Sequence, residues 1–156
     1  MIYLKINKIK SLANKLANKY STRDPFKLAE HLKIKVFFVP LGNIDGFYKY
    51  MKRHKCIFLN SDCEDTDFQK FVMAHELGHA LLHPKENYCY IENFTNLKII
   101  QSEVEANHFA AQFLIPDEAI YEIYRSNNSV TLSQLSKCLG YSQQIILLRF
   151  KNSGLY

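Results

Sequence analysis

Hydrophobic residues recur every three or four positions over the first twenty residues, and lysines fill the opposite face of the implied helix. This spacing predicts an amphipathic helix that packs one side against a core. The segment 21–25 interrupts the pattern. Asp24 followed by Pro25 is typical of a helix start, so we expect a short second helix that runs to about Leu32.

Three short segments rich in β-branched and aromatic residues come next, at 34–39, 46–50 and 56–59. Each has the length and composition of a strand, and Pro40 ends the first. The polar run 52–55 between the second and third segments indicates a hairpin turn. The sequence therefore predicts a small three-stranded sheet, either mixed or antiparallel.

Helical spacing dominates the rest of the chain. We expect one helix that begins at Thr66 or Asp67 and ends near His83-Pro84, followed by helices over 101–114, 117–124, 131–139 and 142–150. Gly140 has the position of the residue that ends the fourth of these. The order of elements predicts an α+β fold, a mostly helical single domain with the sheet packed on the helix that begins near residue 66.

Composition narrows the class of protein. The chain has 156 residues, of which 47% are hydrophobic, enough for one domain with a core. The net charge of +5 comes from scattered lysines and indicates solubility more than a nucleic-acid surface. The chain has neither a signal-peptide pattern nor an apolar run long enough to span a membrane, and its four cysteines form no C-x-x-C pair. We therefore expect a cytoplasmic protein with free thiols.

The helix that begins near residue 66 carries His75-Glu76-Leu77-Gly78-His79. Two histidines four residues apart lie on one face of a helix, where both imidazoles can bind one Zn²⁺. The glutamate beside the first histidine can then act as general base. Two core histidines that bond to backbone are the structural alternative, which fits this spacing less well. Gly78, inside a helix, predicts that another element packs close to the backbone there.

A zinc site needs a third protein ligand. Six residues after His79, where one zinc-protease pattern has a third histidine, this chain has Lys85. On a helical projection of 101–114, Glu103 lies at the centre of an apolar face, where a carboxylate needs a cation. We therefore predict Glu103 as the third ligand, with a buried ion pair to lysine or arginine as the alternative. The same projection places Glu105 on a solvated face.

Two further side chains are expected next to the ligands. Asn107 lies one turn after Glu103, where it can hydrogen-bond a ligand imidazole. His83 lies one turn after His79, and we expect it to end the helix or to support a ligand.

Several segments together resemble the ImmA/IrrE metallopeptidases. They are R-D-P-F-K-L-A-E-H-L-K-I at 23–34, G-F-Y and I-F-L-N between 46 and 60, H-E-L-G-H-A-L-L-H-P at 75–84, and E-V-E-A-N-H-F-A-A-Q-F-L-I-P at 103–116. The resemblance implies a zincin-like fold and a gluzincin-like site, with His75, His79 and Glu103 holding one Zn²⁺ per chain and Glu76 as base. The family often has Asp at the position of Asn107, so the orienting group would be neutral here.

The resemblance also implies a biological role, because members encoded on phages and mobile elements cleave helix-turn-helix repressors. We therefore predict a zinc-dependent endopeptidase that inactivates such a repressor by site-specific cleavage, with a protein substrate and no membrane or direct DNA contact. The whole chain, 1–156, forms one metallopeptidase domain, in which 1–124 is the catalytic part and 125–156 adds closing helices. The alternative is a zinc-containing regulator that binds a repressor partner or DNA without proteolysis.

The ligand set does not identify the metal ion, because Mn²⁺ or Fe²⁺ would accept similar ligands. A peptide substrate is expected along the 46–59 hairpin, and Tyr88, Tyr90 and Tyr121 are available as transition-state donors. The C-terminal pair of helices has helix-turn-helix spacing, but Gln143-Gln144 and four aliphatic residues open its second helix. We expect that pair to close the core rather than to read DNA.

Overall fold

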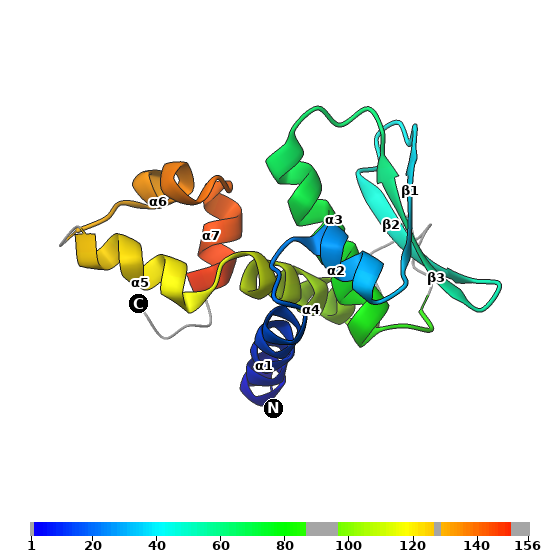
Figure 1. Ribbon diagram of the computed structural model, residues 1–156, viewed down its shortest axis with the longest axis horizontal. Coiled ribbons are helices and arrows are strands. Elements are labelled where there is room, and N and C mark those ends of the chain that lie inside the picture. Colours follow the sequence, from blue (N-terminus) through cyan, green and yellow to red (C-terminus); the bar gives the residue numbers. More distant parts are fainter. Residues whose placement is uncertain (1, 87–96, 127–128, 151–156) are drawn as a thin grey trace.

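A computed structural model describes residues 2–86, 97–126 and 129–150 of the chain. The described elements run in the order α1 (Ile2–Tyr20), α2 (Pro25–His31), β1 (Lys35–Val39), β2 (Gly46–Met51), β3 (His54–Asn60), α3 (Thr66–Leu82), α4 (Leu97–Leu114), α5 (Asp117–Ser126), α6 (Leu132–Leu139) and α7 (Gln143–Phe150) (Figure 1). This is the α+β arrangement that the sequence predicts. None of the described helices is long and apolar enough to cross a bilayer.

The two N-terminal helices form as their sequences predict. The apolar face of α1 is buried against the core through Ile9, Ala13 and Ala17. The side chain of Asp24 accepts hydrogen bonds from the first backbone N–H groups of α2, and Pro25 occupies the first turn, where a missing N–H costs nothing. The predicted cap and helix start are both confirmed.

The sheet is mixed. Its strand order is β1-β3-β2, with β1 parallel and β2 antiparallel to β3. The turn between β2 and β3 uses Lys52 and Arg53, both at positive φ, which gives the hairpin the twist of its strands. Ile57 and Leu59 of the central strand are fully buried on the face that carries α3. The strand β2 therefore lies at an edge of the described sheet.

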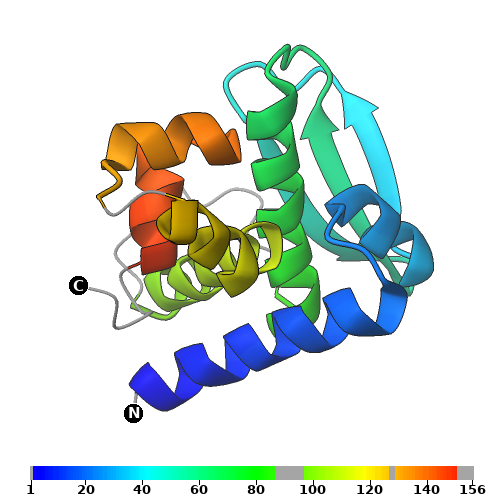
Figure 2. The same cartoon turned by 60° about the vertical axis from the view of Figure 1, so that its left-hand side comes forward.

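The helix α3 lies between the sheet and α4 (Figure 2). Its N-cap is Asp65, whose side chain accepts hydrogen bonds from the N–H groups of Asp67 and Phe68. The helix begins at Thr66, the first of the two predicted starts. A Cβ on Gly78 would stand 2.9 Å from the Cα of Ala106. The two helices therefore touch backbone to backbone at this glycine, as the sequence predicts.

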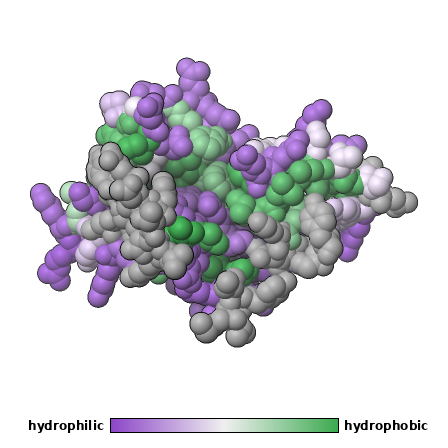
Figure 3. All heavy atoms as spheres, turned by 180° about the vertical axis from the view of Figure 1, so that it is seen from behind, coloured by the Kyte–Doolittle hydropathy of each residue, from purple (hydrophilic) through white to green (hydrophobic). Residues whose placement is uncertain are grey.

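The C-terminal helices gather beside α4, away from the sheet (Figures 1 and 2). The helix α4 begins at Leu97, four residues before the predicted start at 101. A capping box of Thr131 and Gln134 begins α6, and Gly140 ends it with φ of 74°. Seen from behind, hydrophobic side chains form a band over these helices (Figure 3). Ile146 and Phe150 of α7 are buried, so this pair of helices closes part of the core.

Candidate metal centre

Two helices place three metal-binding side chains together. His75 and His79 lie one turn apart on α3, with their Nε2 atoms 3.1 Å from each other. From α4, one carboxylate oxygen of Glu103 lies 3.2 Å from Nε2 of His75, and the other lies 3.2 Å from Nε2 of His79. Among the described residues these three are a group of His and carboxylate side chains able to share one ion.

The spacing and chemistry of these donors fit a zinc-sized cation. Ligand atoms about 2.0–2.1 Å from a tetrahedral zinc ion stand about 3.3 Å apart, close to the separations seen here. Two nitrogens and one carboxylate oxygen also leave a coordination position open, which is typical of a catalytic and not of a structural zinc site. The three side chains could therefore hold a metal ion without a change of backbone.

Asn107 fixes the orientation of the first histidine. Its Oδ1 lies 2.9 Å from Nδ1 of His75. Since an amide oxygen only accepts, Nδ1 carries a proton and donates it, so in the neutral ring the lone pair lies on Nε2. The hydrogen bond thus points the ligand-forming nitrogen of His75 at Glu103 and His79.

Glu76 is buried beside the histidines and is fastened to the sheet. Burial raises the pKa of its carboxyl, while the nearby His75 and His79 and a hydrogen bond from the backbone N–H of Tyr48 act in the opposite direction. The net direction is upward, which would suit a carboxylate that accepts a proton near neutral pH. The Tyr48 contact could not be predicted from the sequence, although Tyr48 lies in a strand of the sheet that was expected to pack on this helix.

Glu103 is ionised, whereas burial alone would favour its neutral form. Burial raises its pKa, but hydrogen bonds and charge from His75 and His79 outweigh this and hold the pKa well below its usual range. For His75, burial lowers the pKa, and contacts with Glu103, Glu76 and Asn107 more than reverse that effect. The cluster without a metal thus already joins an anionic oxygen to two imidazoles.

These side chains lie at one end of a cleft of about 600 Å³. One wall is the first half of β2 and the loop before it, and the other is α3 with part of α4. The lining residues are Asn43, Ile44, Asp45, Gly46, Phe47, Tyr48, Phe68, Phe71, Val72, His75, Glu76, His79, Glu86, Glu103 and Asn107. They include four carboxylates and neither lysine nor arginine, although the chain carries a net charge of +5. Negative charge therefore concentrates where a cation would bind.

The prediction for Glu105 was wrong. Its side chain is 8% exposed and receives hydrogen bonds or ion pairs from Lys5 (2.5 Å) and Gln101 (3.0 Å), whereas the side chain of Glu103 is 34% exposed. His108 and Gln112, on the same face of α4 as Glu105, are buried as well. The helical projection treated 101–114 in isolation, and α1 covers the face that it marked as wet. Glu103 faces the cleft, not the centre of the core.

His83 ends α3, as one of its two predicted roles requires, since its backbone N–H donates to the carbonyl of His79. Its ring centroid lies 6.0 Å from that of His79. Its Nε2 lies 3.4 Å from Glu105, outside the three-residue ligand group. Of the tyrosines considered as donors, Tyr121 projects from α5 and does not line the cleft. Tyr88 and Tyr90 lie outside the described residues.

The arginine of α7, the second helix of the C-terminal pair, is not available to contact DNA. The guanidinium of Arg149, on α7, is 1% exposed. It donates to the carbonyl of Ile115 at 2.6 Å and forms an ion pair with Asp117. A side chain committed in this way cannot contact phosphate or base edges.

Comparisons with known proteins agree with the geometry. A family model described as Peptidase M78, IrrE N-terminal-like domain, matches residues 29–151. The "Uncharacterized immunity region protein 2" of Bacillus phage phi105 is 37% identical over 142 residues, which cover 90% of this chain and 88% of that protein. The "Metallopeptidase ImmA" of Bacillus subtilis (strain 168) is 25% identical over 114 residues, which cover 73% of this chain and 67% of that protein.

Proposed function

The chain belongs to the Peptidase M78 family of metallopeptidases, and from this premise we propose that it is a zinc-dependent endopeptidase. The observation that carries the proposal is the convergence of Nε2 of His75, Nε2 of His79 and the carboxylate of Glu103, with Glu76 buried beside them. His75, His79 and Glu103 would hold one zinc ion per chain.

The side chains around this centre divide the chemistry among them. A zinc ion held by these residues would act as a Lewis acid on the scissile carbonyl. Glu76 takes a proton from the attacking water and later delivers it to the leaving amine, so no net proton is gained or lost by the enzyme. Asn107 holds His75 in the tautomer that offers Nε2. The hydrogen bond from the backbone of Tyr48 keeps Glu76 in place while its charge changes.

An extended peptide fits the open edge of the sheet. The strand β2 lies at the edge of the described sheet and forms one wall of the cleft. A substrate segment can add to it by main-chain hydrogen bonds, which place the peptide between β2 and the ligands from α3. Such binding suits an unfolded or loop segment of a protein.

For the substrate we propose a helix-turn-helix repressor, whose cleavage would inactivate it. The phage relative is named for an immunity region, and the Bacillus subtilis relative is named a metallopeptidase. Together they support a peptidase that acts in the control of phage or mobile-element genes. A repressor as substrate implies action in the cytoplasm, which suits the free thiols of Cys56, Cys63 and Cys138. Cys89 lies outside the described residues.

The test uses the repressor encoded beside the gene. The zinc-loaded protein should produce one discrete cut, which mass spectrometry of the fragments would locate. Glu76→Gln should retain zinc, measured by metal analysis, and lose about 10²–10⁴-fold in cleavage rate, because only the base is removed. If both proteins leave the repressor whole yet abolish its operator binding, a regulator that acts without proteolysis replaces the protease.

A further inference from the structure

We propose that the end of the cleft formed by Ile44, Phe68 and Phe71 is a specificity subsite, which receives one large apolar side chain of the substrate beside the scissile bond. This inference rests on the proposed peptidase function and names the residue type at which the enzyme cuts. Nothing in the peptidase chemistry itself demands this preference, since any peptide bond could be hydrolysed at the metal.

The cleft is divided into two chemically different ends. His75, His79, Glu76, Glu86 and Glu103 lie at the polar end. The other end is lined by apolar side chains from both walls, Ile44, Phe68, Phe71 and Val72. The ring centroid of Phe71 lies 6.4 Å from that of His75, so the apolar wall begins directly beside a metal ligand. A side chain one residue from the cut would therefore reach it.

The apolar wall is held in place by its own elements. The N–H of Phe68 donates to the cap residue Asp65 at 3.0 Å, which fixes the first turn of α3. A Cβ on Gly46 would lie 2.8 Å from Cγ1 of Val72, so the glycine lets β2 pack directly against Val72 of α3. Preformed walls of this kind take a side chain without a cost in reordering.

Two of the wall residues remain open to solvent. Phe68 is 39% exposed and Ile44 is 37% exposed, although both border a concave site. A large apolar side chain of the substrate would remove part of this surface from water, which favours binding. Asp45 also lines this end, while lysine and arginine are absent from the lining, so an acidic side chain would be repelled.

The direction of β2 relates the subsite to one side of the cut. Gly46 lies beside Val72, and the backbone of Tyr48 bonds Glu76, so β2 and α3 advance in the same direction along the cleft. A peptide paired antiparallel to β2, the more stable pairing, runs from the polar end toward the apolar end. The residue that enters the subsite is then the one that follows the scissile bond.

The first experiment maps cleavage preference. The zinc-loaded full chain is incubated with a pool of decapeptides of mixed sequence, and cut sites are identified by mass spectrometry. We expect bonds that precede Phe, Leu, Met or Tyr to be cut about 10- to 100-fold faster than bonds that precede Ala, and those before Asp to be cut least. Cuts without preference at that position would overturn the inference while leaving the peptidase function intact.

Variants assign the preference to named residues. Phe68→Ala should lower the ratio of kcat/KM for peptides with a large apolar residue after the cut to kcat/KM for alanine peptides by about 10-fold. Ile44→Ser, in a loop, should act in the same direction with less risk to folding. Phe37→Ala is the matched control, since Phe37 is 40% exposed but lies on β1 away from the cleft. A preference that survives both cleft substitutions would refute the assignment.

A measurement without turnover separates the two proposals. Dipeptide hydroxamates anchor on zinc, so their affinity can be compared for a benzyl and a methyl side chain by calorimetry. We expect about 10- to 100-fold tighter binding of the benzyl compound to the wild type and to Glu76→Gln, and less than about 3-fold for Phe68→Ala. Equal affinities would sink the subsite. A benzyl preference without any peptide cleavage would sink the peptidase and keep the subsite.

Discussion

The cleft and the C-terminal helices use the same kinds of side chain in opposite ways. In the cleft, His75, His79 and Glu103 turn three electron-pair donors toward one point. Among the C-terminal helices, Arg149 gives its protons to the carbonyl of Ile115 and to Asp117, which also pairs with Lys10 at 2.6 Å. The first three groups converge on a point where a cation would fit, whereas the guanidinium of Arg149 already has its counter-charge, although its Nη1 lacks a hydrogen-bond partner. The first arrangement marks a binding site, and the second fastens α5 and α7 to α1.

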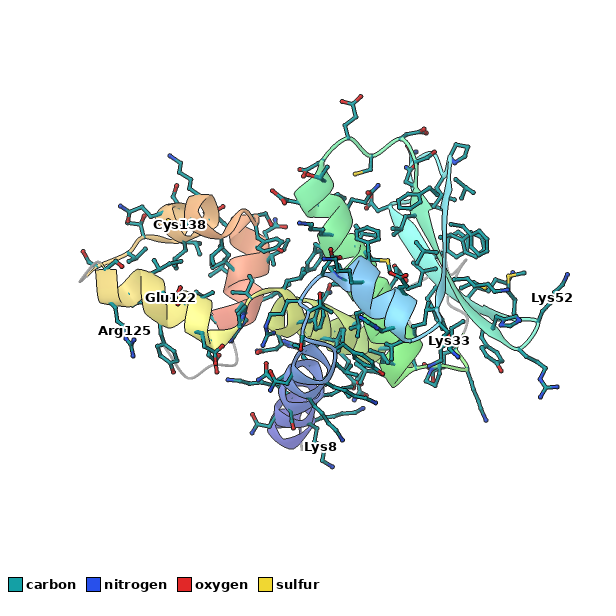
Figure 4. All side chains as sticks on the ribbon, viewed as in Figure 1. Lys8, Lys33, Lys52, Glu122, Arg125 and Cys138 are labelled. Atoms are coloured by element: carbon teal, nitrogen blue, oxygen red, sulfur yellow. The ribbon has the colours of Figure 1, made fainter. Side chains whose placement is uncertain are left out.

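The largest effect is expected where the C-terminal pairing is broken. Asp117→Ala would leave the buried guanidinium of Arg149 without its counter-charge, which should cost about 3 kcal/mol in free energy of unfolding. Urea titration of the metal-free protein measures this. Glu122→Ala, on the exposed side of the same helix α5, should change the free energy by less than about 0.5 kcal/mol. In Figure 4 its neighbour Arg125 likewise points away from the body of the protein. Equal effects of the two substitutions would show that the pairing of Arg149 is not structural.

Removal of a ligand from the cleft should act on metal binding, with little effect on the stability of the metal-free protein. We expect Glu103→Ala to weaken zinc binding by about 100-fold or more, measured by competition with a chromogenic chelator. Glu105→Ala, two residues away, should change zinc affinity by less than about 3-fold and instead lower the free energy of unfolding, since it leaves Lys5 and Gln101 without their acceptor. The reverse outcome would show that Glu105, and not Glu103, binds the metal.

A smaller effect should follow from a change of the group that orients His75. Asn107→Ala removes the acceptor for Nδ1 of His75 and should weaken zinc binding by about 10-fold. Asn107→Asp keeps the acceptor and adds a charge, so it should bind zinc at least as tightly as the wild type. If Asn107→Ala binds zinc unchanged, the ring is held by its packing alone.

The smallest expected effect is a pH dependence of the C-terminal pairing. Burial raises the pKa of Asp117, but contacts with Lys10 and Arg149 lower the pKa by more than burial raises it, so the net shift is downward. A carboxylate with a depressed pKa in the folded state contributes its stability above the pKa of the unfolded chain, about 3.9, and loses it as pH falls through the folded value. The stability gap between wild type and Asp117→Asn should therefore narrow below about pH 4. A gap that is constant from pH 7 to 3 would contradict this.

The sequence predicted the elements well because their signals are local. The Asp24 cap, the glycine that ends α6 and the β-branched strands each depend on a few neighbouring residues. Gly78 predicted a close contact correctly, since a helical glycine needs a reason, although only the structure identified Ala106 as the partner. The start of α4 at Leu97 was missed because residues 84–100 show no clear helical periodicity, although Asn96, directly before Leu97, is a residue type favoured at a helix start.

Features that depend on two distant segments could not be predicted in the same way. The solvent exposure of Glu105 was misjudged because α1, a hundred residues earlier, covers it. The apolar face around Glu103 also misled, since Val104 within it is 45% exposed. The choice of Glu103 agrees with the geometry of the cluster, but its environment is a cleft wall and not a core. The bond from Tyr48 to Glu76 likewise requires the sheet to be placed on α3.

The contact between Gly78 and Ala106 links the supply of metal to the lifetime of the protein. The candidate ligands come from both helices that meet there, so an ion bound to all three clamps α3 to α4 across the contact. Any opening motion that separates these helices must first release the ion, and by mass action an ion at one hundred times its dissociation constant opposes that opening by about 2.7 kcal/mol. If the protein is the metallopeptidase proposed above, a shortage of the metal ion would both abolish its activity and make it easier to degrade.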